Sequence, residues 1–159
     1  MKRIGVTGHR TIPDGCLAHV EEGLRAALGG HPGPLEALSS LADGADQLFA
    51  AIALEYGAEL TVVIPSGDYE DTFRDSRGLA AYRRLKDRAT QEVLMGFPRS
   101  TDEAYYAAGT YIAESCDRLV AVWDGLPARG HGGTGEIVAY ARALGKPVTV
   151  IWPEGAARD

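Results

Sequence analysis

RIGVTGHRTIPDG, residues 3–15, begins with a short apolar run that ends in Thr7-Gly8-His9-Arg10. Such a run is typical of a buried strand, and the glycine places a tight turn directly after it. His9 and Arg10 can hold an anion, although each is also an ordinary residue of a loop or core. The stretch therefore predicts a strand that leads into a turn able to bind an anionic ligand.

The same order, an apolar strand followed by a helix, recurs along the whole chain. Strands that alternate with helices predict a parallel sheet with right-handed crossovers. We therefore expect residues 1–159 to form a single Rossmann-like domain, a doubly wound α/β fold with a mainly parallel sheet flanked by helices. Strands are expected at 2–8, 35–42, 59–65, 92–98, 117–125 and 146–153, and helices at 13–30, 43–57, 75–90, 100–116 and 132–145.

Composition limits the classes of function. A charged fraction of 24% and an apolar fraction of 45% are typical of a globular protein. The net charge of −6 argues against a nucleic-acid backbone as partner, so we expect no direct nucleic-acid binding. No signal peptide and no membrane-length apolar run is seen, so we expect a cytoplasmic protein without a membrane partner. The two cysteines and four histidines lack metal-ligand spacing, so no metal site is expected.

Three strand-to-helix junctions are rich in glycine and small polar residues. In a doubly wound sheet, ligands bind beyond the carboxyl ends of the strands. Free N–H groups at helix N-termini bind anions there, and glycine lets a phosphate approach the backbone. We therefore expect these junctions to act as phosphate-binding loops. The candidate ligand-binding residues are Gly8, His9, Arg10, Ser39, Ser40, Ala42, Gly44, Asp46, Pro65, Trp123, Asp124, Gly125, Gly132, Gly133 and Thr134.

Some polar residues have structural explanations that compete with a functional one. Asp43 or a neighbour is expected to cap the second helix. Asp46 lies in the first turn of that helix, where the dipole favours a carboxylate in any case. Tyr105, Tyr106 and Tyr111 are expected to pack against the sheet rather than to stack on a base.

Glu136 is the candidate catalytic residue. It opens a helix after a glycine-rich loop, where a carboxylate can stabilise or attack a ribosyl centre as an N-glycosidic bond breaks. A first-turn glutamate is also stabilised by the helix dipole alone, by about 0.3–1 kcal/mol. Both explanations stay open. Residues 69–84 form a candidate flap, with Tyr69, Arg74 or Arg77 touching the ligand.

Two common nucleotide motifs are missing from the sequence. No G-x-G-x-x-G follows the first strand, which argues against an ordinary dinucleotide dehydrogenase. No G-x-x-x-x-G-K-[ST] is present, which argues against a P-loop NTPase. A phosphate-bearing ligand would therefore be held by loops of another kind.

Three stretches of the sequence resemble the loops of the SLOG superfamily of Rossmann-like domains: TGHR at 7–10, SSLADGAD at 39–46 and GGTGE at 132–136. This superfamily includes the Lonely Guy phosphoribohydrolases, once misnamed lysine decarboxylases, and the DNA-processing protein A domain. SSLADGAD is similar to the Ser-Gly-x-Ala-x-Gly-x-Asp loop of the DNA-processing branch. GGTGE is similar to the Pro-Gly-Gly-x-Gly-Thr-x-x-Glu loop of the Lonely Guy branch. The resemblance covers about residues 3–153 and implies nucleotide binding and a homodimer.

The sequence also departs from the Lonely Guy pattern. His131 stands in place of proline, Glu136 follows Thr134 by only two residues, and residues 100–116 lack the branch's Arg-Lys pair. Arg129 or Arg10 could replace that pair in space. Residues 118–148 are also similar to nucleoside 2-deoxyribosyltransferases, in which the corresponding glutamate is the nucleophile.

Two functions therefore compete. The first is a ligand-sensing module that binds a nucleoside monophosphate, ADP-ribose or NAD and requires no other cofactor. The alternative is a phosphoribohydrolase acting on nucleoside 5′-monophosphates, or a deoxyribosyltransferase-like enzyme, with Glu136 as its catalytic residue.

Overall fold

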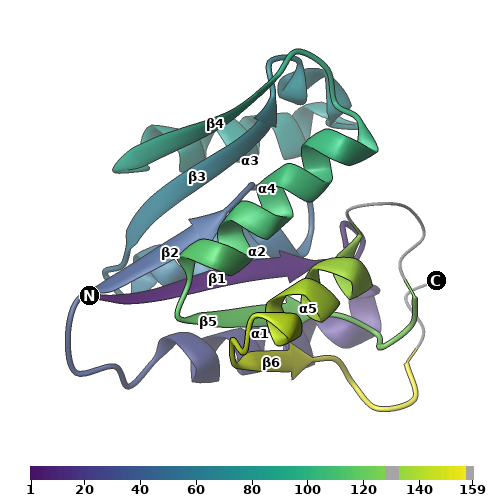
Figure 1. The fold of residues 1–159 in the computed structure, drawn as a ribbon. Coiled ribbons are helices and arrows are strands. Elements are labelled where there is room, and N and C mark those ends of the chain that lie inside the picture. The colour runs from purple at the N-terminus through teal and green to yellow at the C-terminus, as the bar shows by residue number, and fades with distance from the viewer. Residues whose placement is uncertain (128–132, 157–159) are drawn as a thin grey trace.

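The computed structural model describes residues 1–127 and 133–156 and is built on one six-stranded sheet (Figure 1). All neighbouring strands pair in parallel, in the order β4-β3-β2-β1-β5-β6. The order reverses between β1 and β5, which confirms the doubly wound α/β prediction. The strands are β1 (Lys2–Gly8), β2 (Leu35–Ser39), β3 (Glu59–Ser66), β4 (Gln91–Phe97), β5 (Arg118–Val122) and β6 (Val148–Ile151).

Five α-helices of the described chain cover the two faces of the sheet. On one face lie α1 (Leu17–Leu28), α2 (Ala45–Glu55) and α3 (Ser76–Asp87), and on the other lie α4 (Asp102–Ser115) and α5 (Thr134–Ala143) (Figure 1). Two 3-10 turns, η1 (Asp14–Cys16) and η2 (Tyr69–Thr72), precede α1 and α3. Across the described residues, every helix is too short or too polar to cross a membrane.

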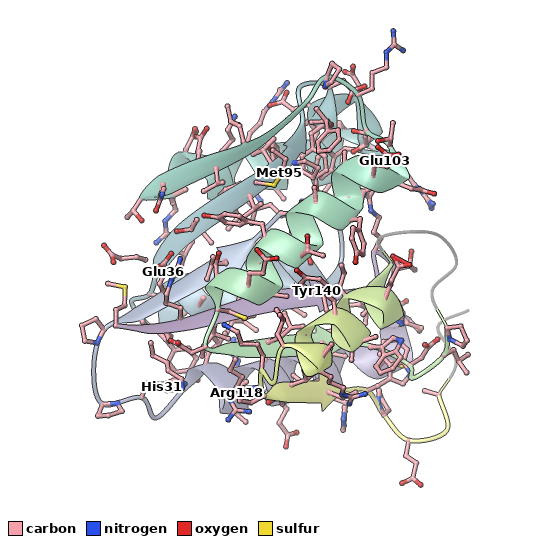
Figure 2. All side chains as sticks on the ribbon, in the orientation of Figure 1. His31, Glu36, Met95, Glu103, Arg118 and Tyr140 are labelled. Atoms are coloured by element: carbon pink, nitrogen blue, oxygen red, sulfur yellow. The ribbon has the colours of Figure 1, made fainter. Side chains whose placement is uncertain are left out.

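Apolar side chains are buried on both faces of the sheet. Ala37 and Leu38 are neighbours on β2, are fully buried and point into opposite cores. This double burial explains why the central strands read as continuous apolar runs. Met95 of β4 and Tyr140 of α5, both labelled in Figure 2, are partly buried and pack against the core beneath α4 and α5.

Helix caps show where local sequence rules held. The Thr101 side chain accepts a hydrogen bond from the Ala104 N–H at 3.2 Å and so caps the start of α4. Of the expected caps of α2, Asp43 or a neighbour, the structure has the neighbour Gly44 as N-cap, which has no side chain to accept a bond. The Asp46 carboxylate instead reaches back to the Ala42 N–H at 3.3 Å.

Candidate functional site

A cleft of about 580 Å³ lies at the carboxyl edge of the sheet, beside the point where the strand order reverses. Its walls come from the segments after β1, β2 and β3 and from α4 and α5. This is the position at which doubly wound folds bind ligands. Nine of the predicted binding residues line it: Gly8, His9, Arg10, Ser40, Ala42, Asp46, Pro65, Gly133 and Thr134.

The remaining candidates lie elsewhere. Ser39, Gly44, Trp123, Asp124, Gly125 and Glu136 do not line the cleft, and Gly132, Arg129 and His131 lie outside the described residues. The segment after β5 is folded on itself, since Trp123 Nε1 donates to the Leu126 carbonyl at 2.8 Å. The Leu126 N–H in turn donates to Asp124 Oδ1 at 3.0 Å. These residues therefore shape a neighbouring loop.

Gly8 is required by close packing at the end of β1. A Cβ at this position would lie 2.5 Å from Ala45 Cβ and 2.9 Å from Val122 Cβ. The glycine thus lets β1 meet both α2 and β5. The turn that follows is brought directly to the cleft.

His9 joins the loop after β1 to the loop after β5. Its ring is 7% exposed, Nε2 accepts a hydrogen bond from the Asp124 N–H at 3.1 Å, and Trp152 packs against it edge-on. Acceptance at Nε2 requires a ring without a proton on that atom. The same Nε2 lies 3.4 Å from Asp124 Oδ1, a contact that would be an ion pair with a protonated ring. Arg10 is the cation that the TGHR turn brings to the cleft.

Among the described residues, two guanidinium groups line the cleft. The Arg10 guanidinium carbon lies 5.3 Å from the centre of the Tyr105 ring, a cation–π contact, and Arg74 enters from the segment before α3. Burial, and next the charge of Asp75, raise the pKa of Asp43, while Arg10 and Arg74 oppose the rise. Both arginines therefore act on the same neighbourhood, and both are exposed enough to meet an anion.

Residues 39–46 hold their shape through their own hydrogen bonds. Ser39 is fully buried; its hydroxyl donates to the Asp46 carbonyl at 3.2 Å and accepts from the Leu41 N–H at 3.0 Å. Leu41 has a φ of +57°, a left-handed conformation that costs a non-glycine residue about 1–2 kcal/mol. Ser39 therefore supports the loop, and Ser40 is its hydroxyl residue that lines the cleft.

Asp46 supplies an acidic group to the cleft. Burial raises the pKa of Asp46 to about 7, while the Ala42 N–H and the charge of Arg10 work against this shift. Tyr69 of η2 lines the cleft nearby, and burial, followed by the charge of Asp46, holds the pKa of its hydroxyl well above the usual value. Near neutral pH the cleft can therefore offer Asp46 in both protonation states.

The N-terminal end of α5 faces the cleft. Gly133 is the N-cap residue, and Thr134 is 8% exposed. First-turn N–H groups of a helix bind anions. Glu136 also lies in this turn and is partly buried, but it is not a lining residue. The candidate catalytic carboxylate thus lies beside the cleft.

Other lining residues were missed or assigned differently from the sequence. Tyr105 packs against the core, as expected, and it also lines the cleft together with Ala108, Gly109 and Ile112 of α4. The spacing of these four residues places them on one helix face, a signal that was present in the sequence. From the candidate flap, Tyr69 and Arg74 line the cleft and Arg77 does not.

A second cavity, of about 490 Å³, lies between α1 and the edge strand β6. Its lining includes His31 and Arg118, both labelled in Figure 2, and Arg118 donates to the Thr149 hydroxyl at 3.1 Å. None of the predicted binding residues lies there. Within the described part of the chain, no three His, Cys, Asp or Glu side chains come together as a metal site.

Comparison with known proteins gives likenesses of structure. No protein-family model matches the sequence, and a search of curated proteins found no match. DNA processing protein A from Streptococcus pneumoniae superposes with a TM-score of 0.68 at 21% identity, over 94% of this chain and 50% of that chain. DNA processing protein A from Helicobacter pylori, described as binding single-stranded DNA, superposes with a TM-score of 0.67 at 14% identity, over 94% and 64%. A molybdenum cofactor carrier protein from Chlamydomonas reinhardtii superposes with a TM-score of 0.58 at 21% identity, over 94% of this chain and 75% of that chain.

The likeness to a protein that binds single-stranded DNA contradicts the prediction of no nucleic-acid partner. That prediction rested on the net charge of −6, which averages over a surface with segregated charges. Residues 74–99 hold seven of the chain's 16 basic residues and three of its 22 acidic ones. Net charge alone therefore could not exclude such a partner.

The chain spans half and 64% of the length of the two DNA processing proteins. The Rossmann-like fold that the sequence resemblance implied is confirmed by these likenesses. At 14–21% identity, the likenesses establish for this chain the Rossmann-like fold that those proteins share.

Proposed function

We propose that the cleft binds a nucleotide or nucleotide-derived ligand and that the chain acts as a ligand-binding module. The observation that supports this most strongly is the combination of Arg10, Arg74 and the N-terminal end of α5 in one cleft at the point where strand order reverses. These groups suit a phosphate. The Tyr105 ring and the apolar side of α4 suit a base or sugar. A volume of about 580 Å³ is in the range of small-ligand sites.

Binding is tested with a panel of nucleoside monophosphates, NAD and ADP-ribose, read out by thermal shift and calorimetry. Gly133→Asp is the informative variant, because Gly133 is the N-cap of α5 and has an ordinary φ of −71°. Aspartate and asparagine are both good N-caps and have the same shape, so either variant should fold.

The aspartate should weaken binding of a phosphorylated ligand at least tenfold relative to Gly133→Asn, on the order of 1.4 kcal/mol, because its charge faces the anion. Equal affinities of the two variants would show that the phosphate does not bind at this end of α5. Arg142→Ala, at the far end of the same helix, serves as the unaffected control.

A phosphoribohydrolase, or a deoxyribosyltransferase-like enzyme, is the second candidate function. The observation that favours it is the place of Glu136 in the first turn of α5, next to the lining residues Gly133 and Thr134. Purified protein incubated with nucleoside monophosphates should then release free base, detected by chromatography. Glu136→Gln should abolish the release and leave affinity unchanged; equal turnover by the variant would exclude Glu136 as the catalyst.

Single-stranded DNA is a further candidate ligand. It is favoured by the basic stretch 74–99, which has a net charge of +4 and includes the cleft residue Arg74. Fluorescence anisotropy of a labelled oligonucleotide tests it directly. Binding that is competed by a mononucleotide would place the strand in the cleft, whereas no binding at low salt would exclude this candidate.

A further inference from the structure

In the cleft, the carboxylate of Asp46 lies among side chains that favour binding of an anion. Arg10, Arg74 and Thr134 line the same space. A carboxylate repels a bare phosphate at close range, and the repulsion is stronger where water is partly excluded. A ligand that suits the whole cleft therefore needs a hydroxyl donor as well as an anionic group.

The fold fixes Asp46 so that one of its carboxylate oxygens is used within the protein. Oδ2 accepts the Ala42 N–H at 3.3 Å, and the Asp46 carbonyl accepts the Ser39 hydroxyl at 3.2 Å. Among the described residues, no hydrogen bond reaches Oδ1, and Asp46 is partly exposed where it lines the cleft. Oδ1 is therefore the acceptor that the protein offers to a ligand.

On the basis of the proposed nucleotide site, we infer that Asp46 accepts a hydrogen bond from a ribose hydroxyl, so that the cleft prefers ribonucleotides to their deoxy forms. Hydrogen bonds to an ionised acceptor are among the stronger ones in proteins. A site built for a hydroxyl discriminates against an analogue that lacks it, because the partly desolvated acceptor is then left without a partner.

The groups around Asp46 are compatible with this role. Arg10, from the loop after β1, favours the carboxylate, whereas burial favours the protonated acid and raises the pKa of Asp46 to about 7. Tyr69 approaches from η2. A ligand hydroxyl that donates to Oδ1 favours the charged form, so ligand binding and ionisation of Asp46 support one another.

The test measures the affinities of AMP, GMP, CMP and UMP, each against its 2′-deoxy and 3′-deoxy forms, by calorimetry. The wild-type protein should bind the ribonucleotide at least about tenfold more tightly than one of its deoxy forms. In Asp46→Ala that ratio should fall to within about twofold. Asp43→Ala is the matched control, since Asp43 is a neighbouring acid that does not line the cleft, and it should keep the ratio.

Each outcome decides the inference. Equal affinities for all three forms in the wild-type protein, or an unchanged ratio in Asp46→Ala, overturn it and leave the proposed nucleotide site intact. No binding of any nucleotide overturns the proposed function as well. If Asp46→Ala does not fold, Asp46→Asn decides: it keeps an acceptor for the Ala42 N–H but no charge, so an unchanged ratio in this variant also overturns the inference.

Discussion

At the carboxyl edge of the sheet, the partly exposed side chain of Asp46 lies near Tyr69, and two opposing effects act on its pKa: burial raises it, and the charge of Arg10 lowers it. Burial has the larger effect, and the pKa of Asp46 rises to about 7 from an ordinary value of 3.8. The folded protein therefore binds this proton more tightly than the unfolded chain does. Below about pH 4 both states are protonated, and above about pH 7 both are ionised.

Between these limits the unfolded state loses its proton first, so Asp46 lowers the stability of the fold as pH rises from 4 to 7. The full effect is on the order of 4 kcal/mol. Asp46→Asn cannot titrate, so its free energy of unfolding relative to the wild type should increase across this window. Urea unfolding at pH 4.5 and pH 8 measures the difference, and other titrating groups cancel because both proteins carry them. The same difference at the two pH values would contradict the assignment.

At the scale of elements, the start of α2 depends on a backbone position that only glycine fills easily. Gly44 has a φ of +81°, and a Cβ there would lie 2.3 Å from the Arg10 carbonyl oxygen. The same glycine lets the Ala45 N–H donate to the His9 carbonyl at 3.1 Å, which ties α2 to the turn after β1. Two of the cleft-forming segments are thereby fixed to each other.

Gly57, just after the end of α2, is the matched comparison for Gly44. It has a φ of +80°, but a Cβ at this position would meet no atom within 4 Å. Gly57→Ala should therefore lose only about 1–2 kcal/mol, the cost of a left-handed alanine. Gly44→Ala adds a steric clash with backbone, so its loss should exceed that of Gly57→Ala by about a further 1 kcal/mol or more. Chemical denaturation compares the two, and equal losses would show that the close approach is not limiting.

Strands and helices could be predicted because their signals are local. Apolar runs such as the one around Ala37 mark buried strands, and Thr101 marks a helix start by its own side chain. The orientation of side chains in the loops could not be predicted, because it depends on what packs opposite. Ser39 points its hydroxyl into its own loop, and Tyr105 lies on the face of α4 that lines the cleft. Arg74 reaches the same cleft from a segment far from Arg10 in the sequence.

Over the whole molecule, opposite charges are concentrated in different regions. The stretch 74–99 has a net charge of +4, although the chain as a whole has −6. Arg77 and Arg84 of α3 and Arg88, its C-cap residue, are exposed and are spaced seven and four residues apart, so they lie along one side of the helix. They extend over roughly 17 Å, starting at the helix end nearest the cleft. A chain of phosphates could follow this row, whereas a single small anion could meet only one of its members.

This arrangement predicts how single-stranded DNA binding, if it occurs in the cleft, should respond to salt. Contacts of this row with three phosphates should contribute a slope of about −2 to the fall of the logarithm of the association constant with the logarithm of salt concentration, in addition to any contacts in the cleft. Replacing Arg77, Arg84 and Arg88 by alanine should remove most of that slope and weaken binding, because fewer counterions are released.

Arg142→Ala, on the opposite face of the sheet, is the control. It should leave the affinity nearly unchanged and should alter the salt slope by no more than about 0.7, the contribution of one phosphate contact. Anisotropy titrations at salt concentrations between about 50 and 200 mM measure the slope for the triple variant and for Arg142→Ala. An unchanged slope in the triple variant would mean that the basic face of α3 does not contact the strand.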